Sequence, residues 1–137
     1  MQPIVVNVDS FGQVFSDSLI PALEKAYAEA ERPVKGVLFT NPHNPFGQCY
    51  PRETIEAVIR FCSQRDIHFI SDELYALSNI KKEFEEDDGV PFISALEINV
   101  GSLGCNLARV HTIWSSSKDL GSSGLRMVSA QREMRGI

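Results

Sequence analysis

Cysteine is scarce in this 137-residue chain and is not arranged in pairs. The three cysteines are Cys49, Cys62 and Cys105, and no two of them form a Cys-x-x-Cys motif. An odd number at such wide spacing argues against a disulfide framework and against a structural zinc site. The pattern is typical of a protein kept in a reducing compartment, so we expect a cytoplasmic location.

Long hydrophobic runs and an excess of basic residues are also missing. No stretch approaches the ~20 apolar residues that a membrane span needs, and the apolar run 4–8 is too short for the core of a signal peptide. Acidic residues outnumber basic ones by 18 to 13, the net charge is −5, and there is no basic stripe. We therefore expect neither a membrane nor a nucleic acid as a partner.

Motifs that would identify several other enzyme classes are absent. The sequence has no Gly-x-Gly-x-x-Gly and no phosphate-binding P-loop, which argues against the common nucleotide-binding folds. It has no Gly-x-Ser-x-Gly elbow, which argues against a serine hydrolase. His43, His68 and His111 do not have the spacing of metal ligands, so no metal site is predicted.

What is present is an alternation of predicted helices and strands. Pro21 is tolerated only in the first turn of a helix, so the first helix should begin near Ser18. The continuous apolar strand at 36–40 suits a parallel sheet that is covered on both faces. The fold class that we predict is α/β, with a mostly parallel sheet and flanking helices. The predicted strands cover residues 4–8, 36–40, 67–71, 110–114 and 127–131, and the predicted helices cover residues 16–31, 51–64 and 92–98.

Polar side chains gather just beyond the carboxyl ends of three predicted strands. Asn-Pro-His-Asn-Pro-Phe-Gly occupies residues 41–47, Ser-Asp-Glu-Leu-Tyr occupies 71–75, Ser-Ser-Ser-Lys-Asp-Leu-Gly occupies 115–121, and Arg126 follows. Ligands of open α/β sheets bind at this edge. The segments offer an amide, a carboxylate, a phenol, an amine, hydroxyls and a guanidinium. That set suits one ligand well, pyridoxal 5'-phosphate (PLP).

The chemistry of PLP gives each of these groups a role. The cofactor itself is the electron sink, so the protein must supply a lysine that forms an imine, an acid for the pyridine nitrogen, donors to the phenolic oxygen and ligands for the phosphate. Hydroxyls and a guanidinium match phosphate oxygens. The lysine must be buried or lie near cations to lose its proton readily. The candidates are Lys118 for the imine, Asp72 for the pyridinium, Asn44 and Tyr75 for the phenolic oxygen, and Ser115, Ser117 and Arg126 for the phosphate.

Each candidate taken alone has a simpler interpretation. Lys118 would be a solvated surface lysine, Asp72 a helix N-cap, Asn44 a turn residue and Tyr75 a half-buried core residue. The serine run would be a flexible loop. Glu73 is the less favoured partner for the pyridinium, because it points differently from its neighbour. The interpretation as a PLP site therefore depends on the whole set occurring in order.

Taken together, these segments resemble the cofactor motifs of fold-type I PLP enzymes, the class I/II aminotransferases. Within that superfamily the Lys-Asp-Leu-Gly sequence makes the chain look most like the 1-aminocyclopropane-1-carboxylate (ACC) synthase group. The spacings are also similar, since Asp72 follows Asn44 by 28 positions and Arg126 follows Lys118 by 8. Val128 departs from the pattern, because the family usually has glycine at that point.

The resemblance implies a fold and an assembly. The fold would be the large domain of a PLP-dependent transferase, with three α/β/α layers. Residues 1–137 would form part of this PLP-binding domain, with the small domain absent. The family is homodimeric, and its substrates are small-molecule amino acids.

The resemblance also implies an activity. Lys118 would hold the internal aldimine and shuttle the α-proton, in an aminotransferase or in an ACC synthase-like lyase. No motif separates transamination from α,γ-elimination. The alternative is a truncated, non-catalytic remnant of such an enzyme, which lacks the segments that bind the substrate.

Overall fold

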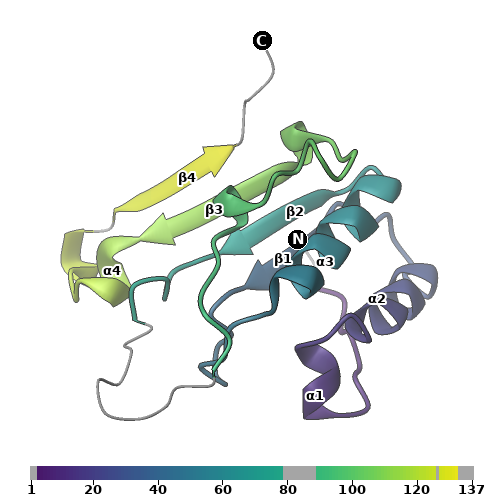
Figure 1. Ribbon diagram of the computed structural model, residues 1–137, viewed down its shortest axis with the longest axis horizontal. Coiled ribbons are helices and arrows are strands. Elements are labelled where there is room, and N and C mark those ends of the chain that lie inside the picture. Colours follow the sequence, from purple (N-terminus) through teal and green to yellow (C-terminus); the bar gives the residue numbers. More distant parts are fainter. Residues whose placement is uncertain (1–2, 79–88, 126, 133–137) are drawn as a thin grey trace.

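A four-stranded sheet organises the computed structural model, which describes residues 3–78, 89–125 and 127–132. β1, β2 and β3 are parallel, and β4 runs antiparallel to β3 (Figure 1). The predicted fold class, α/β with a mostly parallel sheet and flanking helices, is confirmed. In spatial order the strands are β1 (Gly36–Thr40), β2 (His68–Asp72), β3 (Val110–Ser115) and β4 (Val128–Arg132).

The helices pack mainly around the β1–β2 connection. α3 links these two strands and lies against the sheet, and α2 packs beside α3 (Figure 1). In the part of the chain that the structure describes, no helix has the length and apolar character to cross a bilayer. The helices are α1 (Phe11–Val14), α2 (Leu19–Ala28), α3 (Arg52–Gln64) and α4 (Ser116–Asp119), with short 3-10 segments η1 (Ala95–Glu97), η2 (Leu107–Arg109) and η3 (Ser123–Leu125).

α3 forms because its apolar residues recur at the helical period. Ile55, Val58, Ile59 and Cys62 follow the i, i+3, i+4, i+7 pattern, and each is at most 1% exposed. Pro51 is the N-cap, a position where a missing backbone N–H leaves no hydrogen bond unmade. The buried stripe predicted from the sequence is confirmed, and it joins the core cluster of the sheet.

The two faces of the sheet differ in burial. Side chains alternate between the faces along a strand, and Phe39, Phe69 and Val110 are at most 4% exposed. Leu38 points to the opposite face and is 66% exposed. The expectation that residues 36–40 are covered on both faces is therefore not met by the described residues, because the helical residues of the core lie with Phe39 and Phe69.

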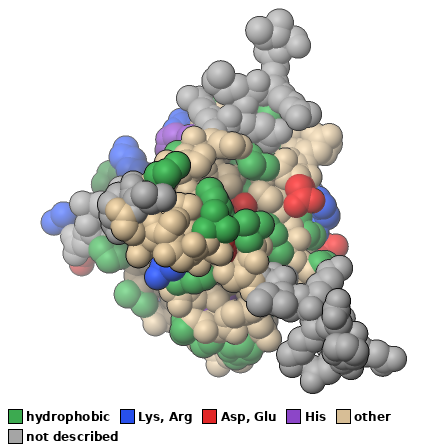
Figure 2. Space-filling view, turned by 90° about the vertical axis from the view of Figure 1, so that its left-hand side faces the viewer, with side chains coloured by type: hydrophobic (Ala, Val, Ile, Leu, Met, Phe, Trp, Pro, Cys, Tyr) green, Lys and Arg blue, Asp and Glu red, His purple; other side chains and the backbone are tan. Residues whose placement is uncertain are grey.

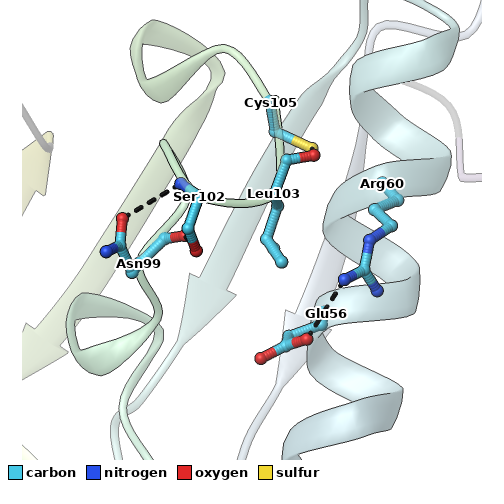
Figure 3. Close-up of polar contacts among 6 residues, drawn as sticks. All are labelled: Glu56, Arg60, Asn99, Ser102, Leu103 and Cys105. Carbon is cyan, nitrogen blue, oxygen red and sulfur yellow. Dashed lines mark hydrogen bonds and ion pairs between the residues drawn. The ribbon is translucent and has the colours of Figure 1, made fainter.

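The turn at residues 99–105 covers part of the core beside α3. Asn99 Oδ1 accepts a hydrogen bond from Ser102 N at 3.1 Å, and Cys105 Sγ lies 3.6 Å from Leu103 O. Figure 3 shows this turn alongside α3. Leu103 and Cys105 pack against the core cluster, so the turn is held by apolar contact as well as by its own hydrogen bonds.

An ion pair on α3 contributes less than this apolar packing. Arg60 Nη2 lies 3.3 Å from Glu56 Oε2, one helical turn earlier (Figure 3). The two side chains are 45% and 23% exposed, so solvent screens the pair, and it stabilises the helix by only about 0.3–0.5 kcal/mol. Burial of the apolar stripe holds α3 in place.

One predicted element is wrong and others shift slightly. Residues 3–8 form no helix or strand, and Ile4 and Val5 are 44% and 74% exposed. A strand needs a neighbour to receive its backbone hydrogen bonds, and this run pairs with no described strand. The first long helix begins at Leu19 with Ser18 as its N-cap, as expected, whereas the predicted helix 92–98 is only the 3-10 segment η1.

The burial of α3 predicts that the same substitution, Ile→Val, lowers the free energy of unfolding more in this helix than in the exposed segment before α1. Ile59 is 1% exposed and Ile4 is 44% exposed. Ile59→Val removes a methylene from the core and should lower the free energy of unfolding by about 1 kcal/mol. Ile4→Val should lower it by less than about 0.5 kcal/mol. Urea unfolding of both variants measures this, and equal effects would contradict the assignment of α3 to the core.

Candidate functional site

The carboxyl ends of β1, β2 and β3 meet at one edge of the sheet. In register, Thr40 lies beside Asp72, and Asp72 lies beside Ile113. Backbone hydrogen bonds continue beyond the strands, since Asn41 N donates to Asp72 O at 3.0 Å and Glu73 N donates to Ile113 O at 2.8 Å. α4 follows β3 at the same edge (Figure 1). The segments that carry the predicted site residues therefore begin side by side.

Asn41 fixes the loop that leaves β1. Its side chain is 1% exposed. Nδ2 donates to Ile93 O at 3.0 Å, and Oδ1 accepts from Tyr50 N at 3.2 Å. Because a buried amide is costly unless both its ends are bonded, these contacts hold the loop in one position. Sequence reasoning gave Asn41 no role, and its only signal was its place directly after a strand and before a proline.

The tip of this loop forms the wall of a pocket. Gly47 N donates to His43 O at 2.7 Å, and Gly47 has φ of +66°, a conformation that favours glycine. The tight turn leaves Asn44 exposed. The pocket has a volume of about 230 Å³ and is lined by Pro42, His43, Asn44, Pro45, Gly47, Tyr75 and Ser78.

This side of the molecule is mostly uncharged. Figure 2 shows the side toward which β1, β2 and β3 run, and most of its described surface is made of backbone, uncharged polar and hydrophobic groups. The pocket brings together two predicted residues, Asn44 and Tyr75, from segments that follow two different strands. A concave surface with a few polar groups among apolar ones is typical of a small-molecule site.

Asp72 lies at the end of β2. Its side chain is half-buried, and Oδ1 accepts a hydrogen bond from Leu74 N at 3.3 Å. This bond is the local contact that an aspartate makes at the start of a turn. Asp72 is not among the residues that line the pocket, and its pairing with a pyridinium stays a prediction.

Glu73 is committed to structural contacts. It is 4% exposed, and burial raises the pKa of its carboxyl group, while the hydrogen bonds that it accepts oppose that rise. These bonds tie the end of β2 to the segment that starts η1, which explains why a carboxylate is tolerated inside the protein. Its carboxylate oxygens accept from Ser71 Oγ at 2.9 Å, Ser94 Oγ at 2.6 Å and Ala95 N at 2.7 Å.

Lys118 lies beside Tyr75. Lys118 belongs to α4, directly after β3, and its Nζ is 5.8 Å from the centre of the Tyr75 ring. An ammonium over an aromatic face at this distance is weakly attracted to it. The lysine is exposed and the tyrosine is half-buried. Of the two expected conditions, burial or nearby cations, the described residues therefore do not provide burial of Lys118.

The predicted phosphate ligands are only partly described. Ser115 is 2% exposed, and its Oγ lies 2.9 Å from Ser117 Oγ and 2.7 Å from Met127 O. It also caps α4 by accepting from Ser117 N at 3.2 Å. The two serines are thus together at the start of α4, although Ser115 already has protein partners. Arg126 lies outside the described residues.

Two buried polar atoms near this edge have no hydrogen-bond partner among the described atoms. They are His43 Nδ1 and Ser116 Oγ, and burial lowers the pKa of His43. Buried polar atoms are normally bonded, and of these two residues His43 also lines the pocket. The amide, phenol, amine and hydroxyls at this edge fit PLP. Within the described ranges, no group of three or more His, Cys, Asp or Glu side chains could hold a metal ion.

Asp119 is a further residue of this edge to which sequence reasoning gave no role. Its carboxylate accepts hydrogen bonds from two segments, the turn after β2 and β3 itself. The only sequence signal was its position directly after Lys118 in the Lys-Asp-Leu-Gly motif. The donors are Leu77 N at 3.0 Å, Ser78 Oγ at 2.7 Å and Trp114 Nε1 at 2.8 Å.

The sheet, with polar residues at its parallel strand ends and a lysine after β3, has the architecture of PLP-dependent transferases. It matches an aspartate aminotransferase from Rhodobacter sphaeroides with a TM-score of 0.63 and 25% identity, over 82% of this chain and 25% of that chain. Residues 13–130 match the family described as Aminotransferase class I and II. The chain therefore belongs to the class I and II aminotransferase family.

Two curated relatives represent the groups that the motifs resemble. The chain is 55% identical over 125 residues to "Probable aminotransferase aclI" of Aspergillus oryzae, which covers 91% of this chain and 30% of that protein. It is 43% identical over 113 residues to "1-aminocyclopropane-1-carboxylate synthase 1" of Oryza sativa subsp. indica. This match covers 78% of this chain and 22% of that protein. The chain thus spans less than a third of the length of either relative.

The buried carboxyl of Glu73 predicts a dependence of stability on pH. Because folding raises its pKa above the ordinary value of 4.5, its stabilising contribution is complete below that value and is lost as the pH rises through the folded pKa. The free energy of unfolding of the wild type should therefore increase relative to that of Glu73→Gln as the pH falls from about 7 toward about 4.

Urea unfolding at a series of pH values measures this difference. Glu29→Gln is the matched control, because Glu29 is exposed at the end of α2, and its difference from the wild type should not follow the same course. A constant difference between the wild type and Glu73→Gln across the series would show that burial does not control this carboxyl group.

Proposed function

We propose that this chain holds PLP at the edge formed by the ends of β1, β2 and β3, as part of an enzyme that acts on amino acids. The strongest support is the neighbourhood of three predicted residues. Asn44 and Tyr75 line one pocket, and Lys118 Nζ lies 5.8 Å from the Tyr75 ring. These side chains follow three different strands, and a shared ligand explains why an amide, a phenol and an amine gather there.

Each residue would have a distinct task. When bound, PLP supplies an electron sink for bonds broken at the α-carbon of the substrate. Lys118 would condense through Nζ with the aldehyde of the cofactor, releasing one water, and would later carry the α-proton of the substrate. Asp72 would keep the pyridine nitrogen protonated. Asn44 and Tyr75 would donate hydrogen bonds to the phenolic oxygen.

The phosphate would lie at the start of α4. Ser117 is half-buried, and its Oγ lies within hydrogen-bond distance of Ser115 Oγ. A serine hydroxyl can donate to a phosphate oxygen while it accepts from the backbone, so Ser115 can cap α4 and still bind the phosphate if it gives up its contact with Met127 O. Arg126, nearby in sequence, would add a bidentate pair to the same group.

The exposure of Lys118 supports the presence of further polypeptide around this residue in the active enzyme. A protonated, solvated lysine is a poor nucleophile, and burial is one way to favour its neutral form. We propose that further polypeptide, from a longer chain or from a second subunit, covers Lys118 in the active enzyme. This view is supported by the length of the two relatives, because the chain spans only 22% to 30% of them. The assembly that we propose is a homodimer.

The reaction class is transamination, or α,γ-elimination as in ACC synthase-like lyases. The relative with 55% identity is named a probable aminotransferase, which favours transamination. The second candidate is a non-catalytic remnant that binds the cofactor without turning over a substrate. It is favoured by the exposure of Lys118, and turnover of an amino acid by the purified chain with PLP would contradict it.

The proposed location is the cytoplasm. All three cysteines keep their thiols in the structure, and burial raises the pKa of Cys62 to about 12. A thiol held protonated in this way reacts slowly with oxidants. Cys62 and Cys105 remain thiols, as is usual for cysteines of proteins in a reducing compartment.

Covalent labelling tests the role of Lys118. The purified chain, incubated with PLP and then reduced with borohydride, should carry the cofactor mainly on Lys118, and Lys118→Ala should lose most of that label. Lys25→Ala is the matched control, since Lys25 lies in α2, a different part of the fold. Peptide mass spectrometry locates the label among the five lysines. Undiminished labelling of Lys118→Ala would contradict the proposal.

A further inference from the structure

One carboxylate joins the segments that follow two neighbouring strands. Asp119 Oδ2 accepts hydrogen bonds from Leu77 N at 3.0 Å and from Trp114 Nε1 at 2.8 Å, and Asp119 Oδ1 accepts from Ser78 Oγ at 2.7 Å. Leu77 and Ser78 are 42 and 41 positions away in sequence. Asp119 therefore ties the turn after β2 to α4, which follows β3.

The donor set suits a charged acceptor. A carboxylate offers two oxygens that only accept, and hydrogen bonds to a charged group are about twice as strong as neutral ones. An asparagine has the same shape but only one accepting oxygen, so it would present an N–H group where either Ser78 or the pair of Leu77 and Trp114 now donates. The described contacts thus distinguish aspartate from its neutral isostere.

The hydrogen bonds of Asp119 lie close in sequence to two of the residues that the proposed cofactor would touch. Lys118 directly precedes Asp119, and Tyr75 lies two positions before Leu77. The Lys118 Nζ lies 5.8 Å from the Tyr75 ring, although Lys118 itself is exposed. With the turn and α4 tied together through Asp119, the backbone positions from which the Lys118 and Tyr75 side chains extend are held at one separation.

We propose that Asp119 is a positioning residue that holds Tyr75 and Lys118 at their working separation, and so directs PLP to Lys118. This inference rests on the proposed function. Asp119 would touch neither the cofactor nor the substrate. It acts through its three hydrogen bonds, and its loss would let the turn after β2 move away from α4.

The first measurement reads the geometry without cofactor. A nuclear Overhauser effect between the Tyr75 ring and the Lys118 side chain should be present in the wild type, and Asp119→Asn should remove it or weaken it strongly. Asp66→Asn is the matched control. Asp66 is also an aspartate with a hydrogen-bonded partner, Arg109 at 2.6 Å, but it precedes β2 at the far end of that strand, and its replacement should leave the effect unchanged.

The chain contains a single tryptophan, so its indole N–H gives one assignable resonance. That resonance should shift in Asp119→Asn, because its acceptor is altered, and should not shift in Asp66→Asn. An unchanged indole resonance together with an unchanged Tyr75–Lys118 effect in Asp119→Asn would overturn the inference, and this outcome does not depend on the binding of PLP.

The second measurement adds PLP and borohydride. The share of label on Lys118, relative to that on Lys25 and Lys35, should fall by about tenfold in Asp119→Asn, which is the size expected from the loss of a charge-assisted hydrogen bond. It should stay unchanged in Asp66→Asn. A lower free energy of unfolding with an unchanged share on Lys118 would mean that Asp119 only stabilises the fold, and would overturn the inference.

Two further variants cover the case in which Asp119→Asn does not fold. Ser78→Ala and Trp114→Phe each remove one donor to Asp119, and each should reduce the share of label on Lys118 by a smaller factor. No reduction in either variant would overturn the inference.

If the wild type itself takes no label on Lys118, the proposed cofactor role fails. The nuclear Overhauser effect between Tyr75 and Lys118, measured in Ser78→Ala, Trp114→Phe and any folded Asp119→Asn, then decides the positioning role separately.

Discussion

The arrangement of this edge depends on the parallel register of three strands. The backbone bonds from Asn41 N to Asp72 O and from Glu73 N to Ile113 O carry that register one step past the ends of β1 and β2. A slip of one residue would turn each side chain to the other face of the sheet. The register therefore decides that the segments after β1, β2 and β3 leave the sheet together.

The regular elements with strong periodicity could be predicted from the sequence, because burial imposes that periodicity. The continuous apolar run of β1 and the helical stripe of α3 both follow from residue types alone. The run at 4–8 has the same apolar character but is not a strand, since a strand is defined by a partner and no partner is encoded in the run itself. The exposure of Leu38 has the same origin, because what covers a sheet face is decided by other segments.

The candidate site could be predicted in part. The order and spacing of the motifs singled out Asn44, Tyr75 and Lys118. In the structure Asn44 and Tyr75 line one pocket, and Lys118 lies beside Tyr75. The supporting contacts of Asn41 and Asp119 could not be predicted. They join segments that are 52 and about 42 positions apart in sequence, and such contacts exist only once the sheet has brought those segments together.

The central claim is that three strand ends form one PLP site. The most direct measurement is the change in the backbone amide resonances of the isotope-labelled chain as PLP is added. The account predicts that the largest changes fall together on three segments, at residues 41–48, 72–78 and 115–119, and saturate at a common PLP concentration. Changes scattered over the surface lysines, or confined to one of the three segments, would contradict it.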